Sequence, residues 1–432
     1  MNNAKELLSF IHNSPSTFHV IENLRTLLKE NGYTELFEGN RWALEKGGQY
    51  FVRRNGTSLI AFRVPNAEPR GFMLSAAHSD SPALRLKEHA EKLSADCVQL
   101  ATETYGGGLL ATWFDRPLSV AGRVFGEENG KLVTRLVNID RDLLIIPSVA
   151  IHMNRAANEG WKINPAVDTL PLFGSEDALG SFGDMIARAA GLRREDILGS
   201  DLSLYVRQEG TLLGAEGEFI ASPRLDDLEC VWSLMQGFLR AEESASVPVC
   251  CVFDNEEVGS ETKQGAASNL LRDTLRRITL TLGMGEEDYL RLLAGSFMLS
   301  ADNAHARHPN HPEYADAQNS PRMNGGVVIK FNANQKYTTD GYSAAVFRAL
   351  CREAGVPVQV FANRSDLPGG STLGSISDTK VAVPTVDIGL AQLAMHSCYE
   401  TAGAKDVDYL IAAAKLFFSR SLSAEDGSTT IC

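Results

Sequence analysis

Three carboxylates, Asp254, Glu256 and Glu257, stand within four residues directly after a short apolar run. The run, residues 247–253, is rich in β-branched and small apolar residues, which is typical of a buried strand. Ionised carboxylates repel one another and are costly beside a core unless a cation lies between them or one carries a proton. Adjacent Glu256 and Glu257 suit a division of labour, one binding a metal and the other moving a proton. A solvated acidic loop is the alternative for this stretch alone.

Four further residues of metal-ligand type lie beside predicted elements. In open parallel sheets, binding sites form outside the carboxyl ends of the strands. The four residues are therefore expected to converge with Glu256 and Glu257, and a mixture of His and carboxylate ligands suits zinc. They are His78 after residues 71–77, Asp302 after residues 296–301, His396 a short loop beyond residues 381–388, and Asp226 in the first turn of a helix.

Each of these residues also has an ordinary structural explanation. His78 and Asp80 fit a turn in which the Asp80 carboxylate is a cap. A metal-binding His, however, usually donates its second ring N–H to a carboxylate, and Asp80 is near enough to accept it. Asp226 and Asp227 lie in a first helical turn, where a carboxylate favours the helix dipole. These separate explanations would have to coincide at every position, so the whole set predicts a metal site.

The number of ligands predicts two metal ions. Two His and three or four carboxylates exceed the four ligands of one tetrahedral ion. They fit two ions about 3.5–4 Å apart that share a carboxylate and a water. We expect His78 and Asp302 on one ion, Glu257 and His396 on the other, Asp226 as the bridge and Glu256 as the base that activates the bridging water.

Residues 305–311 contain three His at three-residue intervals and resemble a metal-binding segment. Pro309 and Pro312 break any helix that would align the imidazoles, and no cysteine lies nearby. We therefore expect His308 and His311 to be loop residues, and His305 to lie at most behind the ligands.

An α/β pattern must position these residues. Residues 1–85 and 222–432 predict a discontinuous catalytic domain with a mixed sheet sandwiched by helices. Between residues 86 and 221 the pattern changes to strand-like alternation with one helical stretch near residues 181–190. This change predicts a smaller, β-rich α+β domain inserted into the first.

Composition excludes several classes of partner. The chain has 432 residues, 44% hydrophobic content and a net charge of −13, which argues against nucleic acid because a basic face is expected there. No apolar run reaches the length of a membrane span, and the first residues show no secretory signal. Seven scattered cysteines without a C-x-x-C motif indicate reduced thiols in a cytoplasm.

Motifs spread along nearly the whole chain match one family in order. The chain resembles the aspartyl aminopeptidase family of co-catalytic zinc exopeptidases. One departure is Asp227, where family members often carry Asn. The matching segments are residues 14–19, 77–82, 147–155, 222–226, 254–260, 300–305, 330–337, 370–372 and 394–397.

The resemblance implies a fold, an activity and an assembly. It implies a phosphorylase/hydrolase-like α/β peptidase domain carrying an inserted dimerisation or lid domain. It also implies two zinc ions per subunit, with cobalt or manganese as substitutes, and removal of N-terminal Asp or Glu from peptides. Members of the family form dimers through the inserted domain and then a closed tetrahedral dodecamer, so we expect a homo-oligomer.

The resemblance also implies roles for individual residues. Glu256, Asp80 and His152 are the expected catalytic residues, and Lys330, Tyr337 and His152 the expected substrate-binding residues. Lys330 would meet the acidic side chain of the substrate, whereas an exposed strand lysine is the alternative. His152 would reach into the neighbouring subunit's site and donate a hydrogen bond to an oxyanion. A satisfied histidine in a core strand of the insert is the alternative.

Two rival functions differ from a metalloaminopeptidase in what they require. A zinc amidohydrolase or carboxypeptidase would act on a small acylated amino acid, and would not release intact N-terminal residues from a peptide series. A non-catalytic shell protein should lack at least one member of the predicted site. All six are present: His78, Asp226, Glu256, Glu257, Asp302 and His396.

Overall fold

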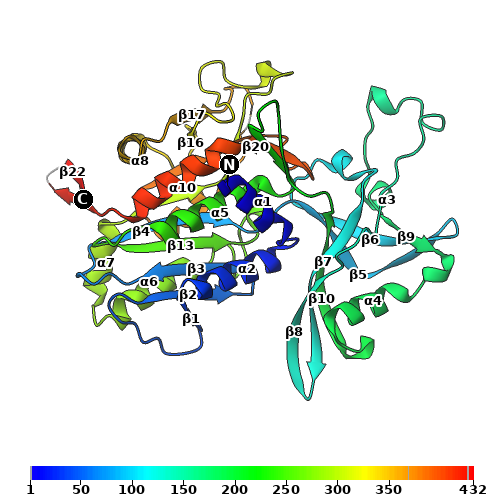
Figure 1. Cartoon of the computed structure of the whole chain (residues 1–432), viewed down its shortest axis with the longest axis horizontal. Coiled ribbons are helices and arrows are strands. Elements are labelled where there is room, and N and C mark those ends of the chain that lie inside the picture. The colour runs from blue at the N-terminus through cyan, green and yellow to red at the C-terminus, as the bar shows by residue number, and fades with distance from the viewer. Residues whose placement is uncertain (1, 368, 426–427) are drawn as a thin grey trace.

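The computed structural model describes residues 2–367, 369–425 and 428–432. It has two lobes, and in Figure 1 a large sheet flanked by helices lies on the left and a second, smaller sheet on the right. The large lobe contains both termini. Within the described residues, no helix is long and apolar enough to cross a membrane.

The large sheet has nine strands in the order β1-β2-β3-β13-β4-β14-β18-β16-β17. Its four central strands run parallel, while β3 pairs antiparallel with β13 and β16 pairs antiparallel with β18. The sheet is therefore mixed, which confirms the predicted fold class. The strands are β1 (Thr34–Leu36), β2 (Gln49–Arg54), β3 (Ser58–Arg63), β4 (Phe72–His78), β13 (Val247–Phe253), β14 (Phe297–Ala301), β16 (Val327–Phe331), β17 (Val358–Ala362) and β18 (Thr385–Gly389).

Helices cover both faces of this sheet because its central strands are apolar on both sides. In β4 every residue is buried, and Met73 and Ala77 join one hydrophobic core while Leu74 and Ala76 join the other, as the two-residue period of a strand requires. The first core includes α1 (Asn2–His12), α2 (Thr17–Glu30), α5 (Leu225–Arg240), α8 (Gly341–Ala354) and α10 (Ala404–Phe418). The second includes α6 (Leu270–Thr281), α7 (Glu286–Ala294) and α9 (Leu373–Asp378).

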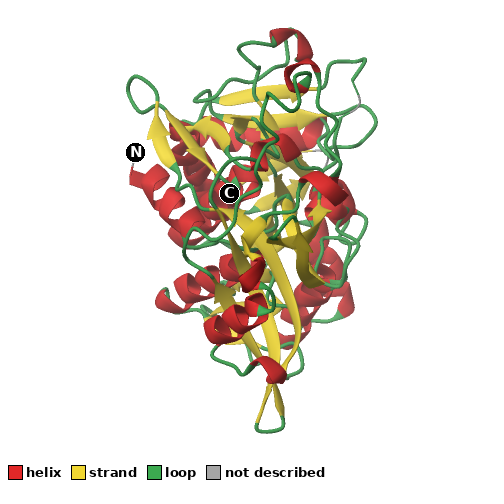
Figure 2. Cartoon of the chain, turned by 90° about the vertical axis from the view of Figure 1, so that its right-hand side faces the viewer, coloured by secondary structure: helices red, strands yellow, loops and turns green. Residues whose placement is uncertain are grey.

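The smaller lobe is built on a six-stranded antiparallel sheet in the order β8-β7-β10-β5-β6-β9. It has its own hydrophobic core. The β7–β8 hairpin projects at the lower end of both views (Figures 1 and 2). Its elements are β5 (Ala83–Ser94), β6 (Cys97–Tyr105), β7 (Leu118–Glu128), β8 (Lys131–Asn138), α3 (Pro165–Asp168), β9 (Leu172–Ser175), α4 (Ser181–Ala190) and β10 (Ile197–Val206).

A third, five-stranded sheet is formed by segments that connect elements of the large lobe. Its order is β11-β12-β20-β19-β15, and it joins the segment before α5 to the segments after β14 and β18. Its strands, with the separate hairpin near the C-terminal end, are β11 (Thr211–Leu213), β12 (Phe219–Ser222), β15 (Ala304–His305), β19 (Ala391–Leu393), β20 (Glu400–Gly403), β21 (Leu422–Glu425) and β22 (Ser428–Ile431).

Candidate metal centre

The predicted ligand residues lie together at the carboxyl ends of the central strands. His78 is the last residue of β4, and Asp302 directly follows β14. Glu256 and Glu257 lie in a single 3-10 turn just beyond β13. These strands are parallel neighbours, so their ends share one edge of the sheet and bring the four side chains to one place.

Asp226 lies between the two histidines. Its Oδ1 is 3.7 Å from Nε2 of His78, and its Oδ2 is 3.3 Å from Nε2 of His396. Nε2 of His396 is also 3.4 Å from Oε2 of Glu257. The backbone of Asp226 departs from helical geometry although the residue opens α5, which directs its carboxylate into this cluster. Each carboxylate oxygen of Asp226 thus faces a different imidazole.

The donor atoms form three overlapping groups, each with its atoms within 4.8 Å of one another. Several of these oxygens are buried and accept no hydrogen bond, namely Asp226 Oδ1, Asp227 Oδ1 and Glu257 Oε1. A buried carboxylate oxygen without a donor is costly, and a cation would compensate it. The groups are His78 with Asp226, Asp227 and Asp302; His78 with Glu256 and Glu257; and Asp226 with Glu257 and His396.

The electrostatics of the cluster also fit a cation. Burial and the nearby carboxyls of Asp302 and Asp80 raise the pKa of Glu256 to about 8, despite the opposing charge of His78. Burial and the Asp226 carboxyl raise the pKa of Glu257 well above its ordinary value. So many carboxylates cannot all be ionised at this spacing unless positive charge lies among them. Imidazole nitrogens with carboxylate oxygens are a donor set that zinc accepts.

Asp80 connects His78 to the loop that carries the two glutamates. Nδ1 of His78 lies 3.1 Å from the carbonyl oxygen of Asp80 and 3.4 Å from its Oδ1. The Asp80 carboxylate accepts the main-chain N–H groups of Glu256 and Glu257, each at 3.2 Å, and the hydroxyl of Tyr105 at 2.6 Å. Asp80 therefore fixes the imidazole and the loop relative to each other. No sequence motif indicates Tyr105, because it comes from β6 of the smaller lobe.

Glu400 is a second supporting residue that no sequence pattern marks. It is 2% exposed, and its two carboxylate oxygens accept the main-chain N–H groups of Asp226 at 3.0 Å and His396 at 2.8 Å. It thereby aligns the backbone of two predicted ligand residues from different elements. Its position four residues after His396 carries no motif that distinguishes it from an ordinary loop carboxylate.

Lys330 lies beside the cluster in β16. Its side chain is 2% exposed, so the alternative of an exposed strand lysine is wrong. Nζ donates to the carbonyl oxygen of Asp302 at 2.7 Å and lies 3.6 Å from Oδ2 of the same residue. Nζ is also 5.1 Å from the centre of the Tyr337 ring. The ammonium group thus holds the Asp302 loop and faces an aromatic ring.

His152 lies apart from this cluster in the single chain. It is exposed in a turn of the smaller lobe, on the segment before α3 that projects in Figure 1. Val149, Ile151 and Met153 around it are 55%, 47% and 83% exposed. The alternative of a satisfied core histidine is therefore wrong. Among the described residues, no hydrogen bond links His152 to the metal cluster.

The histidine-rich segment, residues 305–311, is mostly separate from the ligand cluster within the described residues. His308 and His311 have ring centres 5.5 Å apart, and His311 bonds to Glu313. The donor groups found within the described chain do not include either residue. His305 instead packs edge-on against Phe361. His305 is close enough to Lys330, Asp226 and His396 for their charges to act on its pKa, which burial lowers, so it lies beside the ligand cluster as expected.

Comparisons with known proteins identify the family of the chain. A profile described as "Aminopeptidase I zinc metalloprotease (M18)" matches residues 10–418. A "Probable M18 family aminopeptidase 2" of Clostridium acetobutylicum is 48% identical over 416 residues, covering 94% of this chain and 96% of that protein. A cryo-EM structure of the Ape4 and Nbr1 complex superposes with a TM-score of 0.93 at 36% identity, covering 96% of this chain and 85% of that one. The mApe1 dodecamer of S. cerevisiae gives 0.85 at 29% identity, with 96% of each chain covered. The chain belongs to the M18 family of zinc aminopeptidases.

Proposed function

We propose that this chain is a two-zinc aminopeptidase that removes N-terminal Asp and Glu residues from peptides. The observation that carries the two-ion proposal is the position of Asp226, whose two oxygens face His78 and His396 separately. A carboxylate that presents one oxygen to each of two ligand sets is suited to bridging.

The chain's residues divide between the two ions as follows. When bound, the zinc pair supplies Lewis-acid activation of the scissile carbonyl and of the attacking water. Asp227 is an additional possible donor beside His78. Its Oδ1 is buried without a hydrogen-bond partner, while its Oδ2 accepts the N–H of His78 at 3.1 Å. The assignment is His78 and Asp302 for one ion, Glu257 and His396 for the other, and Asp226 for the bridge.

Glu256 is the proposed proton carrier. It lies within the donor group of His78 and Glu257, so its carboxylate is close to the place where the attacking water would be held. Burial and neighbouring carboxyls raise the pKa of Glu256 above its ordinary value, which is the direction that strengthens a carboxylate as a base. Glu256 would take the proton of the attacking water and pass it to the leaving amine, while Asp80 keeps the loop in position.

Lys330 and Tyr337 are the proposed determinants of acidic specificity. Burial alone would lower the pKa of Lys330, but the Asp302 carboxyl raises it above its ordinary value, so the side chain stays cationic. In a chain with net charge −13, a local cation is required to attract an acidic side chain. This buried ammonium beside the site supplies that charge.

We also propose that the chain works as a homo-oligomer assembled from dimers, up to a tetrahedral dodecamer. The similar mApe1 dodecamer supports assembly, and the exposed apolar segment around His152 offers a surface that assembly would cover. Residues 86–221 would form the dimerisation domain. The first strand of its sheet, β5, begins shortly before this range at Ala83, and β10 ends at Val206. His152 would then complete the site of the adjacent subunit.

A panel of peptides that differ only in the N-terminal residue tests this function. The zinc-loaded protein is expected to release single N-terminal Asp or Glu residues fastest, and to lose activity on chelation. Metal analysis should return two ions per chain. Hydrolysis of small acylated amino acids without stepwise release of residues from peptides would favour an amidohydrolase instead. Equal rates for all peptides of the panel would contradict the proposed preference for acidic N-terminal residues.

A further inference from the structure

A segment of three glycines in the smaller lobe lies against the metal cluster. Residues 106–108 connect β6 to the 3-10 helix that follows it. A Cβ atom built on Gly106 would lie 3.1 Å from Cβ and 3.5 Å from Oε2 of Glu257. One built on Gly107 would lie 3.9 Å from Nδ1 of His396. The glycine segment therefore adjoins both of the ligands that are assigned above to the second ion alone.

The carbonyl oxygen of Gly107 determines which ring nitrogen of His396 can bind a metal. Nδ1 of His396 lies 3.0 Å from this oxygen, and because a carbonyl can only accept, Nδ1 carries the hydrogen. Nε2 lies 3.3 Å from Oδ2 of Asp226 and 3.4 Å from Oε2 of Glu257, and it is the nitrogen left for the metal. A partner of this kind sets the tautomer and the orientation of a ligand histidine. The smaller lobe supplies this partner.

The main chain of His396 is held from both lobes. Its φ is +64°, a left-handed conformation that costs free energy in most residues other than glycine. Glu400 of the large lobe accepts its N–H at 2.8 Å, and Leu109 of the smaller lobe donates an N–H to its carbonyl oxygen at 2.9 Å. Leu109 directly follows the glycine segment, so a shift of that segment would also move this donor.

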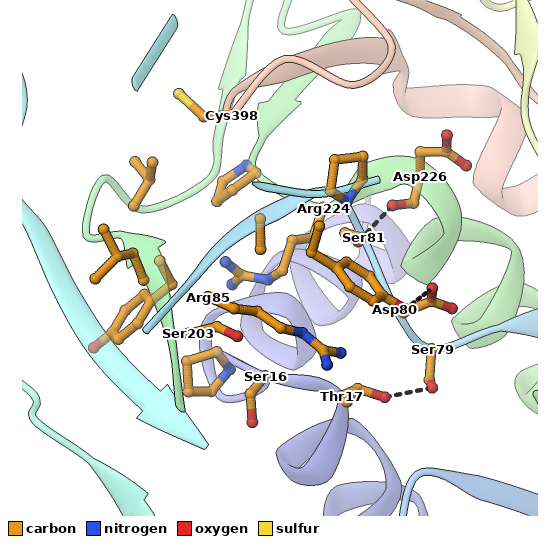
Figure 3. Close-up of a pocket in the computed structure, with 18 of the residues that line it drawn as sticks. Ser16, Thr17, Ser79, Asp80, Ser81, Arg85, Ser203, Arg224, Asp226 and Cys398 are labelled. Atoms are coloured by element: carbon orange, nitrogen blue, oxygen red, sulfur yellow. Dashed lines mark hydrogen bonds between the residues drawn. The ribbon is translucent and has the colours of Figure 1, made fainter. Parts of the chain in front are cut away.

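The residues after His396 are anchored in the smaller lobe as well. The main-chain N–H of Cys398 donates to the hydroxyl of Thr112 at 3.0 Å, and Sγ of Cys398 lies 2.8 Å from the Thr112 carbonyl oxygen. The Cys398 side chain belongs to the hydrophobic core of the smaller lobe. Figure 3 shows Cys398 in the wall of a cavity between the lobes, together with Ser203 of β10 and Asp80. The loop that carries His396 is thus attached to the smaller lobe.

The ligands of the other proposed ion are supported from within the large lobe. Nδ1 of His78 lies 3.1 Å from the carbonyl oxygen of Asp80, and the carbonyl of Asp302 accepts the ammonium group of Lys330 at 2.7 Å. Tyr105 of the smaller lobe reaches this side indirectly, because its hydroxyl bonds to Asp80 and not to a ligand. The two ions would therefore depend on the smaller lobe to different degrees.

We propose that residues 106–108 are positioning residues for Glu257 and His396, so that the affinity for the ion assigned to these two ligands depends on the smaller lobe. This inference rests on the two-zinc function proposed above. The segment limits where the Glu257 side chain can lie, and its carbonyl orients the imidazole. Position 106 requires glycine because φ there is +73° and a side chain would meet Glu257. Displacement of the segment would weaken one ion and spare the other.

Gly106→Ala tests this inference, and Gly130→Ala is its matched control. Both glycines have a φ of +73° and lie in the smaller lobe. At Gly130, in the β7–β8 turn, no atom of the described residues beyond its chain neighbours lies within 4 Å of the added Cβ. The two substitutions thus carry a similar backbone cost, but only Gly106→Ala presses on Glu257. We expect Gly106→Ala to lower the affinity for one of two zinc ions by about 10- to 100-fold, and Gly130→Ala to change neither affinity.

Competition with chelators of graded affinity measures both zinc affinities of the full chain, without recourse to peptidase activity. Thr112→Val removes the hydroxyl that accepts the N–H of Cys398 and strains no glycine, and it should weaken the same ion. In Glu257→Gln, which already lacks a ligand of that ion, Gly106→Ala should have no further effect on the remaining ion. A general loss of stability would not produce this difference between two ions.

The possible outcomes separate this inference from the proposed function. Equal weakening of both ions by Gly106→Ala, or two unchanged affinities, would overturn the inference, while two ions on the wild-type chain would leave the two-zinc function intact. A further loss of affinity in the Glu257→Gln background would show that the segment supports the other ion, and would also overturn the inference. A wild-type chain that binds a single ion would contradict the proposed function, and the inference with it.

Discussion

Glu400 accepts the main-chain N–H of His396 at 2.8 Å from within the protein interior. Its other carboxylate oxygen accepts the N–H of Asp226, a residue 174 positions away in the chain. One buried side chain thus fixes the backbone of two proposed metal ligands that belong to different elements. Partners that orient ligands in this way contribute about 10- to 100-fold to metal affinity.

Glu400→Gln tests this relationship. Glutamine keeps the size of the side chain but replaces one acceptor oxygen with an NH₂ donor that would face an N–H. We expect zinc affinity to fall by about 10- to 100-fold, with turnover recovering at excess zinc. Chelator competition measures the affinity, and Glu287→Gln, at an exposed position of α7, is the matched control. A lower unfolding temperature with unchanged zinc affinity would assign Glu400 a structural role only.

Glu256 and Glu257 are expected to respond differently to the same substitution. Glu256→Gln removes the proton carrier but leaves the ligands, so metal content should stay near wild type while turnover falls by about 100-fold or more. Glu257→Gln removes a ligand and should lower both metal content and turnover. Elemental analysis and steady-state kinetics measure the two effects. Near-normal turnover of Glu256→Gln would show that the base lies elsewhere.

Lys330→Met is expected to weaken cleavage of Asp substrates far more than that of Ala substrates, because only the acidic side chain uses the ammonium charge. The measurement is the ratio of kcat/KM for two peptides that differ in their first residue. Metal content is the control, since Lys330 also donates to the carbonyl of Asp302. Equal losses of kcat/KM for both peptides would show that the substitution disturbs the Asp302 loop and does not act on specificity.

His152→Ala is expected to lower kcat while metal content and assembly stay intact. Removal of one oxyanion donor typically costs about 2.7–4 kcal/mol. Because His152 is exposed and apart from its own chain's cluster, mixed oligomers with Glu256→Gln should regain activity, each hybrid dimer holding one complete site. Assembly is checked by light scattering. Verified mixed oligomers that recover no activity would place His152 outside the partner's site.

Zinc affinity is expected to fall as the pH is lowered. Burial alone would lower the pKa of His396, but its hydrogen bond to Asp226 and the charge of Glu257 raise it to about 10. His396 therefore carries a proton at neutral pH that must leave before it binds metal. Each proton released makes the affinity fall about tenfold per pH unit. Competition with a chelating dye between about pH 6 and pH 8 measures the slope, and a flat profile would contradict the expected proton release.

Much of the candidate site is visible in the sequence because its signals are local. Apolar runs that end in His78, Asp302 or the 254–257 segment predict strands, and the carboxyl ends of parallel strands meet at one edge of a sheet. The change of pattern between residues 86 and 221 likewise reflects strand periodicity within one segment. The side chains that these rules bring together do lie together in the structure.

Only the tertiary structure decided which distant groups support and complete that site. Glu400 and Tyr105 contact the ligand segments because β20 and β6 pack beside them, and no local pattern marks either residue. Whether Lys330 is exposed depends on the neighbours of β16, and the structure buries it. The contact between Gly106 and Glu257 exists only where the two lobes meet. Residue spacing determines the elements and their faces, whereas contacts between residues far apart in the chain depend on how those elements pack.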